Sequence, residues 1–188
     1  MSNTCLLTVG STQFPFLVSA LLSPRLISTL ASSLNIKAVY AQIGHSALPT
    51  GFSIGIQRIE GVQVEITRFA NDLEERVGGS DLVISHAGAG SILSFLRPPL
   101  PSSSSSKSKE RRLILVPNDT LMDSHQSDLA DEMEKKGWAT ICRDSHNLLA
   151  TIADLAASQM KNPPLDNDFP KLDERKVQTI LDETLGYV

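Results

Sequence analysis

Short apolar segments typical of buried strands alternate along this chain with segments of helical spacing. The strand-like segments are LLTVG, KAVYAQIG, VEITRF, LVIS, LILVP and ATIC, and helical patterns lie between most of them. Strands connected through helices form a parallel sheet with helices packed against it. The sequence therefore predicts an α/β fold, a Rossmann-like parallel sheet with helices on both faces. One weakly periodic stretch, roughly Gly44 to Gly61, is expected to be a loop.

The pattern divides the chain into a main domain, residues 1–161, and an appendage, residues 162–188. Inside the main domain, the serine-rich stretch from about 98 to 112 lacks the apolar residues needed to fold, which predicts a disordered surface insertion. The appendage begins with the linker NPPLDNDFP and continues with an apolar stripe at helical spacing. This C-terminal helix either packs on the chain's own sheet or docks on a partner.

Charge and cysteine content argue against several classes of protein. The net charge of -4 gives no electrostatic reason to expect nucleic-acid binding. Cys5 and Cys142 lie in strand-like segments, so we expect both to be buried and reduced, and the sequence has no metal-ligand spacing. It also shows neither a signal peptide nor a segment that could span a bilayer. We expect a cytoplasmic chain that reaches a membrane only through another protein.

The turns after the predicted strands carry the candidate binding residues, because ligands of open parallel sheets bind at the carboxyl ends of strands. Gly10, Ser11 and Thr12 follow the first strand. Glycine there lets a phosphate approach the backbone, and amides and hydroxyls donate hydrogen bonds to it. An ordinary strand-to-helix turn with a serine or threonine cap has the same sequence. On this turn alone, we favour the ordinary connection.

The second turn, SHAGAGS, places two glycines before a helix whose first amides can hold an anion. The third glycine of a dinucleotide-binding G-x-G-x-x-G is absent, and no acidic ribose partner follows at the usual spacing. A nicotinamide or flavin site is therefore only weakly indicated. His86 either contacts a ligand, beside a phosphate or as a base, or hydrogen-bonds the backbone of its own turn.

The third turn, VPNDTLMDSHQ, crowds hydrogen-bonding side chains between a strand end and a helix start. Asp123 and Gln126 have the spacing of a capping box, so both side chains have a purely structural interpretation. The same position also suits polar groups that bind a sugar or a ribose. Nucleophilic catalysis has little support, because Ser91 does not lie in a G-x-S-x-G elbow.

Together, VGSTQF, DLVISHAGAGSIL and NDTLMDSHQSDLADEMEKKG resemble the family-28 glycosyltransferases. The similarity is to the soluble donor-binding subunits of eukaryotic UDP-N-acetylglucosamine transferases, and it runs from about Leu6 to Leu155 without the serine-rich stretch. It implies the C-terminal half of a GT-B enzyme, an inverting transferase that adds the second GlcNAc to GlcNAc-diphosphodolichol in N-glycan precursor synthesis. UDP-GlcNAc would be the donor, and no cofactor or metal is implied.

The resemblance also implies a partner, a membrane-anchored subunit that binds the lipid-linked acceptor. This partner would hold the chain at the cytosolic face of the endoplasmic reticulum, and the chain would be inactive alone. The substrate-binding residues expected for the donor are Gly10, Ser11, Thr12, His86, Gly88, Ala89, Gly90, Ser91, Ser94, Asn118, Asp119, His125 and Gln126. No residue is assigned as the general base, which the partner could supply; His86 is a weak catalytic candidate.

One position departs from the family pattern. Relatives commonly carry a glutamate, suited to the uridine ribose, where this chain has Ser94. A serine lacks the charge and the bidentate reach of a carboxylate. Ribose binding is then weaker, another residue substitutes, or activity is reduced. Ser94 therefore leaves one alternative function open, a non-catalytic regulatory or binding module with a degraded donor site. A second alternative, a dinucleotide-binding oxidoreductase, is suggested by the glycine turn alone.

Overall fold

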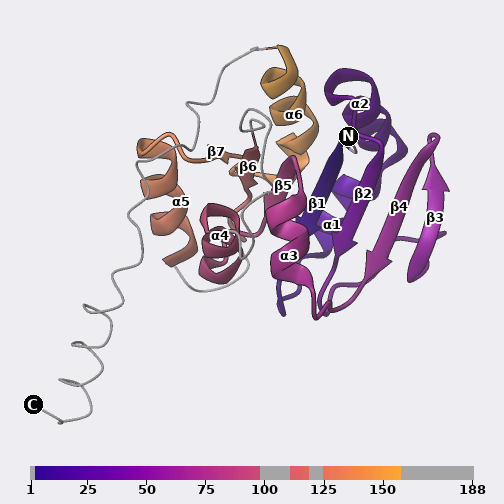
Figure 1. Cartoon of the computed structure of the whole chain (residues 1–188), viewed down its shortest axis with the longest axis horizontal. Coiled ribbons are helices and arrows are strands. Elements are labelled where there is room, and N and C mark those ends of the chain that lie inside the picture. Colours follow the sequence, from indigo (N-terminus) through magenta and orange to yellow (C-terminus); the bar gives the residue numbers. More distant parts are fainter. Residues whose placement is uncertain (1–2, 98–110, 119–124, 158–188) are drawn as a thin grey trace, which may run out of the picture.

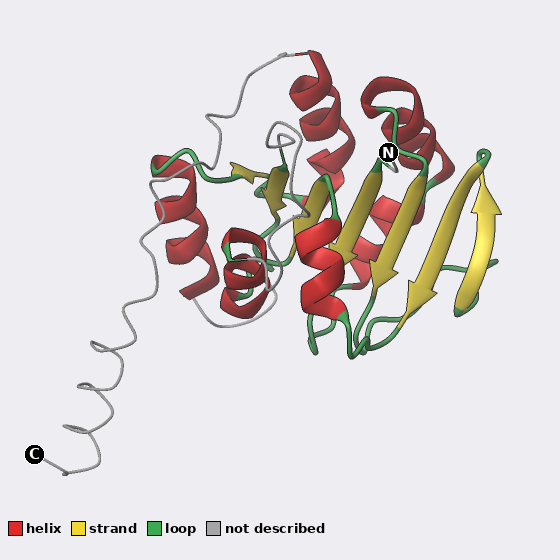
Figure 2. Ribbon diagram, in the orientation of Figure 1, coloured by secondary structure: helices red, strands yellow, loops and turns green. Residues whose placement is uncertain are grey.

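The computed structural model describes residues 3–97, 111–118 and 125–157. These residues form one seven-stranded sheet in the order β3-β4-β2-β1-β5-β6-β7 (Figures 1 and 2). Neighbouring strands run parallel except β3 and β4, which pair antiparallel at one edge. The strands are β1 (Thr4–Thr8), β2 (Ala38–Gln42), β3 (Gly55–Ile59), β4 (Val62–Thr67), β5 (Leu82–Ser85), β6 (Arg112–Leu115) and β7 (Thr140–Ile141).

Helices cover both faces of the sheet, which confirms the predicted Rossmann-like α/β fold. One face carries α1 (Pro15–Leu22), α2 (Pro24–Leu34) and α6 (Leu148–Ala157), which follows the 3-10 helix η1 (Ser145–Asn147). The other face carries α3 (Leu73–Gly79), α4 (Ala89–Leu96) and α5 (His125–Lys135). Successive side chains of β1 point to opposite faces of the sheet. Cys5 and Leu7 therefore pack in the apolar cluster on the face of α1, and Leu6 packs in the cluster on the opposite face. As predicted, Cys5 and Cys142 are buried free thiols.

The helices α1 and α2 are separated at Ser23, where the sequence predicted a new helix start. Ser23 Oγ accepts the Leu26 N–H at 3.3 Å, and Pro24 occupies the first helical position. None of the described helices is by itself long and apolar enough to cross a membrane. The test of length and composition is passed only by α1 and α2 together, and that pair is bent by 59°.

The predicted loop between Gly44 and Gly61 is wrong in part, because it contains β3. This strand is held by main-chain pairing with β4 at the edge of the sheet. Its apolar residue Ile56 is 68% exposed, so no buried apolar face marks the strand. Hydrophobic periodicity detects burial, and an edge strand with little burial gives no such signal.

The predicted insertion, about 98–112, ends earlier than expected. Arg112 is the first residue of β6, and the Arg111 guanidinium donates to the carbonyls of Val77 and Phe95 at 2.7 and 3.0 Å. These carbonyls lie near the C-terminal ends of α3 and α4, where a cation is favourable. The rest of the insertion, 98–110, and the linker with the C-terminal helix, 162–188, lie outside the described residues. The division into two parts stays a prediction.

The connectivity reverses direction between β1 and β5. From β1 the sheet extends through β2 and β4 on one side, and from β5 it extends through β6 and β7 on the other. The loops that leave the carboxyl ends of β1 and β5 therefore diverge from each other. In open α/β sheets such a switch point is where ligands bind.

Candidate functional site

The two glycine turns lie side by side at the switch point. Thr8 pairs with Ser85 at the carboxyl ends of β1 and β5, so both turns begin at one level. Gly10 has a φ of +59° and Ala87 a φ of +63°, so each turn passes through the left-handed region. The next helix, α4, has Gly88 as its N-cap, and no described side chain caps its amides. Free amides at a helix start are the donors that an anion binds.

His86 fills the space between the two turns. The residue is 6% exposed, and its ring Nδ1 lies 3.3 Å from the Thr8 carbonyl oxygen. Burial lowers the pKa of His86 below its usual value, which favours an uncharged ring that donates from Nδ1 to this carbonyl. A Cβ atom added at Gly88 would lie 2.4 Å from Nε2, and one at Gly10 would lie 3.0 Å from Cε1. His86 thus hydrogen-bonds backbone, but that of Thr8 on β1 and not that of its own turn, as one interpretation had it. Contact with a ligand stays a prediction.

A buried network that sequence analysis missed supports the Gly10 turn. Thr8 Oγ1 donates to Gln42 Oε1 at 2.6 Å and accepts the Gly10 N–H at 3.1 Å. Gln42 Nε2 donates to the carbonyls of Gly10 and Arg68 at 2.7 and 2.6 Å. Thr8 is 0% exposed and Gln42 is 1% exposed. Thr8 is the last residue of β1 and Gln42 the last residue of β2, and both strands are otherwise largely apolar. A polar residue at the end of an apolar strand is the sequence signal that could have identified both.

The loop after β2 packs against the same turn. Gly44 has a φ of +52°, and a Cβ atom there would lie 2.6 Å from the carbonyl oxygens of both Gly10 and Thr12. Arg68 Nη1 donates to the Gly44 carbonyl at 3.1 Å, which fixes this loop in turn. The turn after β1 is therefore enclosed on its inner side by backbone that has little freedom to move.

The remaining predicted residues of the two turns also lie at the carboxyl edge. Ser11 is exposed, while Thr12 Oγ1 donates to the Val9 carbonyl within its own turn at 2.7 Å. Ala89 and Gly90 are exposed in the first turn of α4, and Ser91 is half-buried beside them. The structure thus brings together the residues expected to contact a diphosphate. Their binding role stays a prediction.

The third turn is tied to the first by Asn118, which is 2% exposed. Its Nδ2 donates to the Gln13 carbonyl at 3.1 Å, and its backbone N–H donates to Gln126 Oε1 at 3.3 Å. Gln126 lies in the first turn of α5, which begins at His125. Both Asn118 and Gln126 therefore hold backbone in place, whatever else they bind. Asp119, predicted to bind the sugar, lies outside the described residues, as does Asp123.

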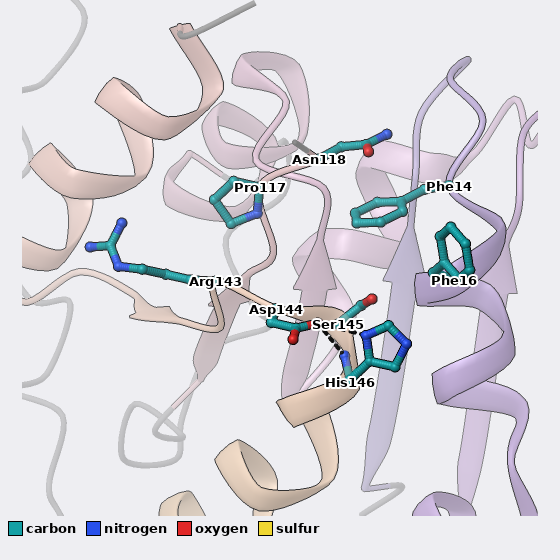
Figure 3. A pocket seen from close by; sticks show the side chains of 8 residues that line it. All are labelled: Phe14, Phe16, Pro117, Asn118, Arg143, Asp144, Ser145 and His146. Carbon is teal, nitrogen blue, oxygen red and sulfur yellow. Dashed lines mark hydrogen bonds and ion pairs between the residues drawn. The ribbon is translucent and has the colours of Figure 1, made fainter. Parts of the chain in front are cut away.

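A cavity of about 300 Å³ opens between the loops after β1, β6 and β7 (Figure 3). Its charged groups are paired: Arg143 contacts Asp131 and Glu134 at 2.8 Å each, and Asp144 accepts the His146 N–H at 2.8 Å. Rings and a proline form its apolar walls, which suits an uncharged group with apolar faces. The cavity is lined by Phe14, Phe16, Pro117, Asn118, Arg143, Asp144, Ser145 and His146.

A second cavity, of about 230 Å³, lies between α3 and α4 and contains Ser94. The Ser94 hydroxyl donates to the Gly90 carbonyl at 2.9 Å, a bond within its own helix. An acidic residue nevertheless lines this cavity, the exposed Glu74 of α3. Within the described residues, the Glu74 carboxylate has no hydrogen bond or ion pair. The remaining lining residues are Leu73, Val77, Gly90 and Ser91.

Two known proteins of similar sequence carry the same name. The chain is 35% identical over 212 aligned positions to the UDP-N-acetylglucosamine transferase subunit ALG13 of Cryptococcus neoformans var. neoformans serotype D (strain JEC21), covering 98% of this chain and 97% of that protein. It is 33% identical over 136 positions to the Homo sapiens protein of the same name, covering 72% of this chain and 10% of that protein.

Solved structures agree with this similarity. The NMR solution structure of ALG13 matches with a TM-score of 0.57 and 26% identity, covering 88% of this chain and 90% of that one. Acinetobacter baumannii MurG matches with a TM-score of 0.57 and 17% identity, covering 88% of this chain and 43% of that one, and this likeness concerns the fold alone. The sequence model of the glycosyltransferase family 28 C-terminal domain matches residues 4–179. The chain therefore belongs to glycosyltransferase family 28, as a protein built on its C-terminal domain.

Proposed function

We propose that the chain is the UDP-GlcNAc-binding subunit of an N-acetylglucosaminyltransferase. The observation that carries this proposal is the uncapped start of α4 beside the Gly10 turn, at the switch point of the sheet. Backbone amides and a helix N-terminus in one place suit a diphosphate. The near full-length similarity to a protein named as a UDP-N-acetylglucosamine transferase subunit supports UDP-GlcNAc as the nucleotide sugar.

The proposed reaction is transfer with inversion at C1 of GlcNAc. An acceptor hydroxyl oxygen attacks C1, the bond from C1 to the phosphate oxygen breaks, and UDP leaves with the bonding electrons. Amides at the start of α4 stabilise the negative charge that develops on UDP. The proton of the acceptor hydroxyl passes to a general base that we place on the partner. His86 stays a weak candidate for this role, because its Nδ1 donates to the Thr8 carbonyl and its Nε2 can still accept a proton. We assign no cofactor to this step.

We further propose that the sugar end of the donor points toward the cavity lined by Phe14 and His146. Asn118 lines this cavity, and Gln126 contacts the same loop, so both are near the proposed GlcNAc site. The paired charges and apolar walls suit an uncharged pyranose better than a diphosphate. The diphosphate would then lie at the two glycine turns, between the sugar and the uridine.

The partner in this proposal is a membrane-anchored subunit that binds GlcNAc-diphosphodolichol at the cytosolic face of the endoplasmic reticulum. The word subunit in the names of the relatives supports a partner. The proposed product carries the second GlcNAc of the N-glycan precursor.

Titration calorimetry tests the donor. We expect UDP and UDP-GlcNAc to bind the chain co-expressed with its candidate membrane partner, and NADH not to bind. NADH binding without UDP-GlcNAc binding would support the oxidoreductase alternative instead. The complex is then assayed for GlcNAc transfer to a lipid-diphosphate acceptor. Binding of UDP-GlcNAc without transfer would identify a non-catalytic module.

Glu74 is proposed to supply the carboxylate that position 94 lacks, by accepting hydrogen bonds from the ribose hydroxyls. Glu74→Gln is then expected to weaken UDP binding about tenfold, since a hydrogen bond to a charged group contributes on the order of 1.5–3 kcal/mol. Affinity for 2′,3′-dideoxy-UDP should not change, because that analogue lacks both hydroxyls. Both affinities are measured by calorimetry.

Glu75→Gln is the matched control. Glu75 has the same charge in the same first turn of α3 but does not line the cavity. Its loss should leave UDP affinity within about twofold, since exposed charges contribute little. Equal effects of the two substitutions would rule out the specific role of Glu74. Ser94→Glu adds a second carboxylate beside the first and should not raise activity; a large gain in transfer would instead indicate a degraded donor site.

A further inference from the structure

Among Gly10, Ser11 and Thr12, hydrogen bonds within the turn after β1 leave one amide for a ligand. Gly10 N–H donates to Thr8 Oγ1, and Thr12 N–H donates to the Val9 carbonyl at 3.2 Å. Within the described residues, the N–H of the exposed Ser11 has no recorded partner. Of the three residues expected at the phosphate, Ser11 is therefore the one whose amide is available. Its direction depends on the conformation of Gly10.

That conformation is fixed from both sides of Gly10. The N–H is held by Thr8 Oγ1, and the carbonyl oxygen accepts from Gln42 Nε2 at 2.7 Å. Gln42 is itself held, because its Oε1 accepts from Thr8 Oγ1 and its Nε2 also donates to the Arg68 carbonyl. These bonds use both polar atoms of the Gln42 side chain. A buried network with its groups satisfied is rigid, and removing one member leaves the others unpaired.

The same network reaches the second turn through Thr8. The Thr8 carbonyl accepts both the His86 N–H and the His86 ring Nδ1, each at 3.3 Å. The imidazole in turn lies against Gly10 and Gly88. Hydrogen bonds and one packed ring therefore join the ends of β4, β2, β1 and β5, from the Arg68 carbonyl to the N-cap of α4.

We propose that Thr8 and Gln42 are positioning residues of the nucleoside-diphosphate site. They hold Gly10 in its left-handed conformation, and through it they set the Ser11 amide relative to the start of α4. Neither side chain touches the ligand. The inference rests on the proposed function for the identity of the ligand, whereas the fixing of Gly10 can be measured without any ligand.

Thr8→Val tests the proposal with little change in shape. It removes the hydroxyl and leaves the Gly10 N–H and Gln42 Oε1 without their partner. We expect UDP affinity, measured by calorimetry, to fall about tenfold, because a buried hydrogen bond is lost and its remaining donor and acceptor are left unpaired. Thr8→Ser keeps the oxygen and should bind UDP within about twofold of the unmodified chain. Loss of affinity in both variants, or in neither, would overturn the proposal.

Ser80→Ala controls for a general loss of stability. Ser80 is 5% exposed, and its hydroxyl donates to the Arg76 carbonyl at 2.7 Å at the amino end of β5, away from the glycine turns. This variant should lower the melting temperature and leave UDP affinity unchanged. If its UDP affinity falls as much as that of Thr8→Val, the effect of Thr8 is one of stability and the positioning role is wrong.

Amide hydrogen exchange at Gly10, followed by NMR without ligand, separates this inference from the proposed function. In Thr8→Val the Gly10 amide should exchange at least about tenfold faster, because its acceptor is gone. An unmodified chain that binds no UDP would refute the proposed function, yet this exchange rate would still decide whether Thr8 fixes the turn. Unchanged exchange would overturn the inference.

Gln42→Glu gives a second variant should Thr8→Val not fold. Its ionised carboxylate would face the carbonyls of Gly10 and Arg68, whereas the protonated acid can donate to one of them. UDP affinity relative to the unmodified chain should therefore recover as the pH falls and the buried carboxyl protonates. A relative affinity that does not depend on pH would contradict the role assigned to Gln42.

Discussion

Gly88→Ala is expected to abolish measurable UDP binding and to lower the free energy of unfolding. The added Cβ would lie 2.4 Å from His86 Nε2 and 2.6 Å from Cε1, so the imidazole must move. That ring is buried between two turns and hydrogen-bonded to the Thr8 carbonyl, which leaves it little room. Overpacking of this kind costs about 1–3 kcal/mol. Denaturant unfolding and UDP calorimetry measure the two effects.

Gly90→Ala is the matched control, two residues further along the same turn. A Cβ atom there meets nothing within 4 Å, and the residue is helical. Alanine should therefore stabilise the fold by about 0.5–1 kcal/mol, since glycine is unfavourable inside a helix. In the double variant Gly88→Ala, His86→Ala, the missing ring should leave room for the new methyl group. Independent, additive losses in that double variant would show that the clash with His86 is not the cause.

Gly44→Ala is expected to cause the largest loss of stability. Its φ of +52° alone costs a non-glycine residue about 1–2 kcal/mol. In addition, the new Cβ would lie 2.6 Å from two carbonyl oxygens, those of Gly10 and Thr12. Both contacts are with backbone, so no side chain can rotate away. We expect a total loss of about 4 kcal/mol or more in denaturant unfolding, together with loss of UDP binding because the turn after β1 must shift.

Gly51→Ala separates the conformational cost from the collision. Gly51 also has a positive φ, of +89°, but a Cβ atom there meets nothing within 4 Å. The free energy of unfolding of Gly51→Ala should fall by only about 1–2 kcal/mol, the cost of the left-handed conformation, and UDP affinity should not change. Equal losses at the two positions would refute the claim that Gly44 is required by its contact with the turn after β1.

The layered fold was predictable because burial leaves a periodic trace in the sequence. The Ser23-Pro24 helix start was predictable for a local reason, since a cap acts on amides three residues away. The edge strand β3 was missed because it is held by pairing rather than burial. Hydrophobic periodicity indicates which side chains are buried, and it does not indicate backbone that pairs at an exposed edge of the sheet.

The candidate site was predictable as a set of turns but not as a set of contacts. Alternation of strands and helices implies a parallel sheet, so the turns that follow its strands were predicted to lie at one edge. The strand order that makes β1 and β5 neighbours was not predicted. The partners inside the site are far apart in sequence: Gln42 lies 34 positions from Thr8, and Asn118 lies 105 positions from Gln13. No local pattern records such pairs. Glu74 was missed for the same reason, since it meets the Ser94 cavity from a different helix.

Arg111 bears on how this protein can change during evolution. Its guanidinium bonds the carbonyls of Val77, Ser80 and Phe95, so it joins the ends of α3 and α4 at the point where the chain re-enters the sheet. The Arg111 side chain therefore helps to hold the two helices at their spacing around the Ser94 cavity. We expect substitutions, insertions or deletions in the serine-rich sequence before Arg111 to leave that spacing unchanged. A chain lengthened or shortened at this point should thus keep the same cavity.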